Sequence, residues 1–156
     1  MVNENRQEIL NNAYEALKNN NFNGTTLLPT GTGKSSLMVR ALQELNPETC
    51  WYLCDSTLNR DETFKNELIK WGAEEYIDRI KFMCYQSACK IHGAKVDLVL
   101  GDEVDYGLTP VYSKALTNNK FKHKVLVSAT LTASKRKMIQ NIAPITFEEN
   151  LEGIQG

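Results

Sequence analysis

The feature that most constrains the fold is the segment Leu-Pro-Thr-Gly-Thr-Gly-Lys-Ser at residues 28–35. It follows the short apolar stretch 25–28 and precedes a segment whose apolar residues recur at helical spacing. We therefore expect it to form the turn between a strand and a helix. Gly31 and Gly33 let the backbone curl so that its N–H groups face an anion, and the positive end of the helix dipole points at the same place. The segment predicts a phosphate-binding loop.

The side chains of this loop indicate a nucleotide with its Mg²⁺. Lys34 is expected to reach the β- and γ-phosphates, and Ser35 to place its hydroxyl on the metal. Leu28 stands where the general pattern G-x-x-x-x-G-K-[ST] has its first Gly. A glycine-rich turn before an amphipathic helix would explain the glycines but not Lys34 and Ser35 directly after Gly33. The expected cofactor-binding residues of the loop are Thr30, Gly31, Thr32, Gly33, Lys34 and Ser35.

The rest of the chain alternates between apolar segments of helical and of strand-like period, which is typical of an α/β protein. In the third expected helix, Phe64, Leu68, Ile69 and Trp71 are predicted to form the buried stripe. The expected helices lie around residues 9–17, from the glycine loop to 45, and at 61–71, and the expected strands at 25–28, 50–54, 81–85, 96–100, 125–127 and 144–147.

Length and composition are those of one globular domain. The chain has 156 residues and a formal charge of −1, so it has no global basic field and any nucleic-acid contact must be local. No apolar run approaches the ~18 residues of a membrane span, and the N-terminus is polar, so we expect a cytoplasmic protein with no membrane contact. Its four cysteines lack the C-x₂-C spacing of zinc sites, and we expect them to be reduced.

A second polar cluster follows the apolar segment Val-Asp-Leu-Val-Leu at 96–100. Asp102 is expected to hold Mg²⁺, and Glu103 to orient and deprotonate a water that attacks a phosphoanhydride. Asp105 completes the group. Acidic residues at strand ends usually lie in solvated turns. In an open parallel sheet, however, ligand sites form at the carboxyl ends of the strands. Behind a phosphate-binding loop, the acidic cluster is therefore predicted to be catalytic.

The loop, the Asp-Glu-Val-Asp cluster and Ser128-Ala129-Thr130 occur in the order found in superfamily 2 helicases and translocases, and the chain resembles their first RecA-like lobe. The resemblance implies a three-layer P-loop NTPase fold with a mostly parallel central sheet over residues 1–156. It implies ATP and Mg²⁺ as cofactors and Lys34, Asp102 and Glu103 as catalytic residues. Asp105, Ser128 and Thr130 would then link the ATP site to the nucleic-acid strand.

The same resemblance indicates further contacts. Ser56, Thr57 and Arg60 stand at the nucleic-acid motif after the second strand, although the family usually has Pro-Thr where this chain has Asp55-Ser56-Thr57. Gln86 and Ser87 resemble another strand-contacting motif, with helix capping as the alternative.

Two further segments have both a functional and a plain interpretation. Arg6-Gln7 precedes the first expected helix where many relatives contact adenine through a Gln, which makes Gln7 a candidate cofactor-binding residue. A plain helix N-terminus explains it almost as well. We expect the Lys-Arg-Lys run at 135–137 to be a solvated helix face.

The expected function is that of the ATP-binding lobe of an ATP-dependent superfamily 2 helicase or translocase. The sequence ends soon after the third motif, so we expect a second RecA-like lobe in cis or in trans to supply arginines for turnover. Nucleic acid is the expected partner, with DNA preferred over RNA. The alternative is a stand-alone P-loop nucleotide switch or nucleotide kinase. The acidic pair and the Ser-Ala-Thr motif favour the motor.

Overall fold

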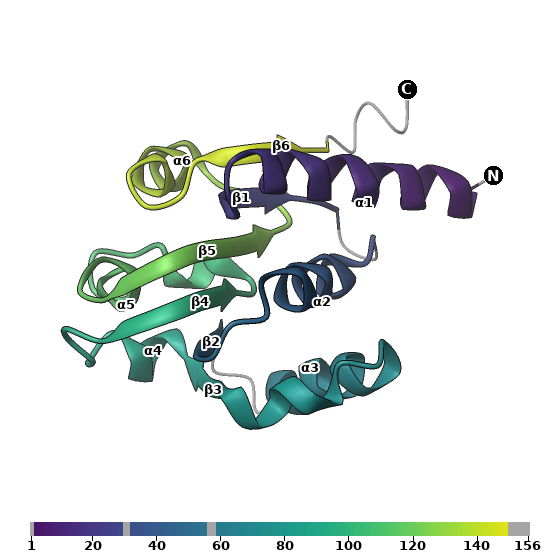
Figure 1. Cartoon of the computed structure of the whole chain (residues 1–156). Coiled ribbons are helices and arrows are strands. Elements are labelled where there is room, and N and C mark those ends of the chain that lie inside the picture. Colours follow the sequence, from purple (N-terminus) through teal and green to yellow (C-terminus); the bar gives the residue numbers. More distant parts are fainter. Residues whose placement is uncertain (1, 30–31, 56–58, 150–156) are drawn as a thin grey trace.

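The computed structural model describes residues 2–29, 32–55 and 59–149, without the side chains of residues 2–4, 59 and 60. Six parallel strands form one sheet in the order β3-β2-β4-β5-β1-β6 (Figure 1). The strands are β1 (Asn23–Leu27), β2 (Cys50–Cys54), β3 (Ile80–Cys84), β4 (Lys95–Gly101), β5 (Lys120–Ser128) and β6 (Ile145–Glu148).

Helices cover both faces of the sheet and make the molecule three layers thick (Figure 1). One face is covered by α1 (Val2–Asn19), α2 (Lys34–Leu45) and α3 (Asn59–Lys70). The other face is covered by α4 (Tyr85–Ala88), α5 (Lys114–Thr117) and α6 (Ala133–Gln140). Two 3₁₀ turns, η1 (Glu74–Arg79) and η2 (Val104–Gly107), complete the connections.

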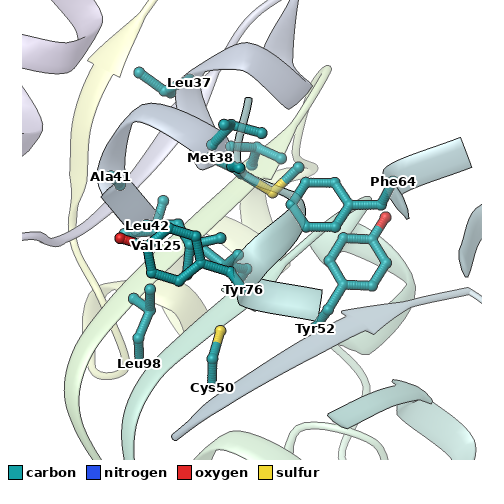
Figure 2. Close-up of a cluster of buried hydrophobic side chains, with 14 of the residues drawn as sticks. Leu37, Met38, Ala41, Leu42, Cys50, Tyr52, Phe64, Tyr76, Leu98 and Val125 are labelled. Carbon is teal, nitrogen blue, oxygen red and sulfur yellow. The ribbon is translucent and has the colours of Figure 1, made fainter. Parts of the chain in front are cut away.

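The central strands are apolar at successive positions because both of their faces are buried. In β2 all five residues are buried, with Tyr52 facing the helix layer of α1–α3 and Trp51 facing that of α4–α6. Figure 2 shows the first of these cores, where side chains of α2, α3 and the strands meet. The Tyr52 and Phe64 rings are stacked there, with centroids 4.3 Å apart and planes at 9°. This packing fixes α2 and α3 on the sheet.

The fold agrees with the α/β prediction, and all expected strands are present. The strand expected at 125–127 is longer, because β5 starts at Lys120. The strand expected at 25–28 begins two residues earlier, because β1 is Asn23–Leu27. Arg6 and Gln7 lie inside α1, which begins at Val2, so the prediction that they precede the first helix is wrong. No helix in the described ranges is long and apolar enough to cross a membrane.

The prediction of the buried stripe in α3 is half wrong. Phe64 and Leu68 are buried, but Ile69 is 51% exposed and Trp71 is 49% exposed. Position 69 is turned by about 100° from position 68 on the helix, and Trp71 follows the last residue of α3. The four cysteines are free thiols, as expected, and Cys84 alone among them is only partly buried.

Candidate functional site

The predicted motifs meet at the edge of the sheet where the parallel strands end, which we call the site edge. The strands β4, β5 and β1 are neighbours in the sheet. The segment after β1 carries the glycine loop, the segment after β4 carries the acidic cluster, and β5 ends at Ser128. Polar residues that are far apart in the sequence are therefore adjacent in space.

The described part of the glycine loop has a local turn followed by a left-handed glycine cap. Thr32 donates from its N–H and from its Oγ1 to the carbonyl of Pro29, at 3.3 and 2.7 Å. Gly33 caps α2 in the left-handed region, with φ +93°, and a side chain there would also meet Leu10 at 3.3 Å. A glycine cap offers no side-chain acceptor, so the first N–H groups of α2 have no capping partner from residue 33.

The first residue of α2, Lys34, faces the acidic cluster. Its ammonium nitrogen is 3.9 Å from Oε1 of Glu103, and the two side chains are 12% and 21% exposed. The Glu103 backbone is itself left-handed, with φ 46° and ψ 52°, a conformation that a non-glycine residue rarely adopts. Strained residues of this kind are concentrated at functional sites. The start of α2 and the acidic cluster are thus adjacent in space.

Asp102 is a buried carboxylate, only 6% exposed. The Tyr52 hydroxyl donates to its Oδ2 at 2.6 Å, and the Tyr85 hydroxyl donates to its backbone carbonyl at 2.8 Å. Burial first, and the Asp102 carboxylate second, raise the pKa of Tyr52 well above its usual value. Tyr52 therefore stays protonated and acts as a permanent donor that orients Asp102.

Asp105 connects the acidic cluster to the end of β5. The Ser128 hydroxyl donates to its Oδ1 at 2.9 Å, and the Lys135 ammonium donates to its carbonyl at 2.8 Å. The Ser128 hydroxyl also lies 3.4 Å from the carbonyl of Thr130. The two segments that the sequence places in separate motifs are thus directly hydrogen-bonded.

Other predicted residues lie away from this cluster or outside the described part. Gln86 and Ser87 are exposed at the start of α4, where Ser87 Oγ lies 3.3 Å from Cys84 Sγ. Gln7 is exposed on α1, with its amide nitrogen 3.1 Å from Asn11 Oδ1. Those outside the described residues are Thr30, Gly31, Ser56, Thr57 and the side chain of Arg60.

Sequence reasoning missed three residues that support the site, namely Tyr52, Tyr85 and Lys135. The two tyrosines lie in apolar stretches, and nothing in their spacing reveals that their hydroxyls meet Asp102. The Lys-Arg-Lys run was expected to be a solvated face. Lys135 departs from that expectation, because it is partly buried against the Asp105 carbonyl. Arg136 is 39% exposed and forms a bidentate pair with Glu148 at 3.0 and 2.5 Å.

The residues present fit a nucleotide-bound Mg²⁺ better than an all-protein metal site. Mg²⁺ is usually held by one or two carboxylates, waters and substrate phosphates. Asp102 supplies an oriented buried carboxylate and Ser35 a partly buried hydroxyl. Among the described residues, no group of three or more His, Cys, Asp or Glu side chains is placed to hold a metal ion.

Three solved structures show a similar fold. The Sulfolobus solfataricus SWI2/SNF2 ATPase core in complex with dsDNA has a TM-score of 0.57 and 15% identity, over 81% of this chain and 31% of that chain. A hypothetical ATP-dependent RNA helicase from Sulfolobus tokodaii has a TM-score of 0.61 and 15% identity, and the match covers 96% of this chain and 53% of that chain. The Pyrococcus furiosus Hef helicase domain has a TM-score of 0.58 and 14% identity, and the match covers 96% of this chain and 38% of that chain.

This chain therefore has the RecA-like α/β fold seen in the ATPase cores of helicases, and it spans about half or less of the chains it matches. No protein-family model matches the sequence. A comparison with curated proteins finds no match either.

Proposed function

We propose that the chain is the ATP-binding lobe of an ATP-dependent superfamily 2 helicase or translocase. The observation that carries this proposal is the meeting of Lys34, after a left-handed glycine cap, with Glu103 and the buried Asp102 at one edge of a parallel sheet. A helix start and a lysine suit a polyphosphate. The carboxylates of Asp102 and Glu103 suit the metal ion that accompanies a polyphosphate and the water that attacks it.

In this proposal the phosphates of ATP bind at the loop 28–35 and the start of α2. Lys34 turns from Glu103 to the β- and γ-phosphates as a point charge, and Ser35 and Asp102 hold Mg²⁺. When bound, Mg²⁺ neutralises negative charge on the phosphate oxygens. Tyr52 keeps the Asp102 carboxylate oriented through the hydrogen bond at 2.6 Å.

Hydrolysis needs a base beside the γ-phosphate. We assign this role to Glu103, which orients a water and accepts its proton. The pair between Lys34 and Glu103 holds both side chains in place before the nucleotide arrives. Full turnover would also need arginines from a second RecA-like lobe, in cis or in trans, because this class of reaction gains about 10³ to 10⁵ in rate from them.

Nucleic acid would lie across the site edge near Gln86 and Ser87, with Ser56, Thr57 and Arg60 as further proposed contacts. The hydrogen bond from Ser128 to Asp105 is the proposed link between the nucleic-acid strand and the bound nucleotide. The S. solfataricus neighbour was solved with dsDNA, which supports nucleic acid as the partner. The preference for DNA over RNA stays a proposal.

The proposal is tested by titrating a fluorescent ATP analogue with Mg²⁺ into the parent chain and the Lys34→Ala variant. We expect the variant to lose nucleotide affinity by tenfold or more while its thermal midpoint stays unchanged, because Lys34 is a charge at a preformed loop. The matched control is Lys122→Ala, which removes a lysine whose side chain is 76% exposed at the other edge of the sheet. Equal affinity of the parent chain and Lys34→Ala for the ATP analogue would contradict the proposal.

A further inference from the structure

A pocket of about 280 Å³ adjoins the glycine loop. The residues that line it come from α1, from the start of α2, and from the end of α3. They are Arg6, Gln7, Leu10, Thr32, Gly33, Ser35, Ser36, Glu67, Lys70 and Trp71. The pocket therefore adjoins the loop that we propose for phosphates, and Asp102 and Glu103 do not line it.

Trp71 lines this pocket and is held in a defined orientation. Its indole Nε1–H donates to Glu67 Oε2 at 2.9 Å, and its carbonyl accepts from Gln43 Nε2 at 3.3 Å. The Lys70 ammonium lies 5.4 Å from the ring centroid. Even so, the side chain is 49% exposed. A large aromatic ring that is anchored at its polar atom and open at its surface is suited to stacking with a ligand.

Trp71 and the glycine loop line one pocket, and the contact with Gln43 shows how far along α2 the Trp71 backbone lies. Gln43, which contacts the Trp71 carbonyl, lies about 10 Å along α2 from Ser36 at the helical rise of about 1.5 Å per residue. Gly33, Ser36 and Trp71 all line the same pocket. A group attached to phosphates at the loop would thus reach the indole ring.

We propose that Trp71 is the stacking surface for the base of the bound nucleotide. This inference rests on the proposed function and adds to it a residue that selects a nucleotide over bare polyphosphate. The base lies against the indole ring in the pocket between α1 and α3. Gln7 is placed on the α1 wall, where its amide can pair with the polar edge of an adenine.

The two tryptophans of the chain make this inference directly measurable. Trp51 is 6% exposed in the core between the sheet and α4–α6, whereas Trp71 lines the pocket. ATP should therefore quench the tryptophan emission of the parent chain and of Trp51→Phe. It should leave the emission of Trp71→Phe unchanged. Inorganic tripolyphosphate, which has no base, should bind without quenching.

The same variants separate the base from the phosphates in affinity. Trp71→Ala should weaken ATP binding by roughly 5- to 150-fold, the range that base–aromatic stacking provides, and leave tripolyphosphate affinity unchanged. Trp71→Phe should retain most of the affinity for ATP because it retains a ring. The matched control is Ile69→Ala, which removes an equally exposed apolar side chain that does not line the pocket. Far-UV circular dichroism would verify that each variant is folded.

Two outcomes distinguish this inference from the proposed function. If Lys34→Ala lost ATP affinity while Trp71→Ala bound ATP as the parent does, the nucleotide site would stand and the role of Trp71 would be overturned. A loss of ATP and tripolyphosphate affinity together in Trp71→Ala would also overturn it, because stacking cannot affect a ligand without a base. If the parent chain bound neither ligand, the proposed function itself would fail.

Discussion

The two ends of strand β4 each carry an aspartate, and the two aspartates differ in burial and in the groups that hold them. Asp97, near the start of the strand, has a side chain that is 28% exposed, accepts the Glu48 N–H at 3.0 Å and faces Lys122 at 3.5 Å. Asp102, directly after the strand, is 6% exposed and is held by the Tyr52 hydroxyl at 2.6 Å. The first lies at the edge where strands begin, which we call the opposite edge, and the second lies at the site edge.

This difference shows which edge of the sheet is built for a ligand. At the opposite edge, charged groups remain in contact with water, so their pairing costs little and contributes little. At the site edge a carboxylate is buried and Glu103 takes a left-handed backbone, and both features cost stability. Because residues in such costly arrangements are concentrated at functional sites, the site edge is where we expect chemistry.

The largest expected effect is that of Glu103→Gln on hydrolysis. The substitution retains the size and hydrogen bonding of the side chain but removes the base, so phosphate release should fall by about 10² to 10⁴ while ATP binding survives. Release of labelled phosphate would be followed with protein in excess over ATP, and Lys34→Ala would define the background. Hydrolysis at the parental rate would transfer the proposed role of base to Asp105.

Next in size is the effect of Tyr52→Phe on stability. The variant retains the ring that stacks on Phe64 but leaves the buried Asp102 carboxylate without its donor, which should lower the free energy of unfolding by about 1 to 3 kcal/mol. Urea unfolding measures this change. Tyr76→Phe is the matched control, because its hydroxyl donates to Asn46 at 3.3 Å in a part-buried position remote from the site. An equal decrease in the free energy of unfolding in Tyr52→Phe and Tyr76→Phe would contradict a special role for the hydrogen bond to buried Asp102.

A smaller effect is expected for Ser128→Ala, which breaks the hydrogen bond to Asp105. The free energy of unfolding should fall by about 1 kcal/mol, typical of one lost hydrogen bond, and nucleotide affinity should remain unchanged. In the proposed motor, the stimulation of ATP hydrolysis by nucleic acid should decrease. A variant with parental stimulation would show that this hydrogen bond does not couple the two ligands.

The smallest effect is expected at the opposite edge, for Asp97→Asn. The Glu48 N–H, and to a lesser extent Lys122, hold the pKa of Asp97 below its usual range. Because the folded pKa is the lower one, the carboxylate contributes stability that is fully present above its unfolded pKa of about 3.9 and is lost as pH falls through the folded value. The variant should lose less than about 1 kcal/mol at neutral pH, and its difference from the parent should shrink in acid. Urea unfolding at several pH values checks both points, and a difference that grew in acid would contradict the sign.

The sequence predicted the strands and the site motifs because both leave local signals. Val-Asp-Leu-Val-Leu at 96–100 is apolar on both faces, and Gly33-Lys34-Ser35 has a spacing that a simple turn does not need. The contact between Tyr52 and Asp102 has no such signal, since it depends on β2 and β4 being neighbours in the sheet. Trp71 was assigned to the core because its spacing fits a helix stripe, but the helix ends before it. Contacts made between elements, and residues just beyond helix ends, are thus what sequence spacing fails to predict.

The most direct test of the central claim is amide hydrogen exchange with and without ATP and Mg²⁺. A pocket of about 340 Å³ at the opposite edge, lined by residues such as Asn46, Asp97 and His123, is larger than the one beside the glycine loop and provides an internal control. We predict that nucleotide protects the segments 28–36 and 101–105 and leaves 45–48 and 120–123 unchanged. Protection confined to the opposite edge, or spread equally over both, would contradict the assignment of the site edge as the nucleotide site.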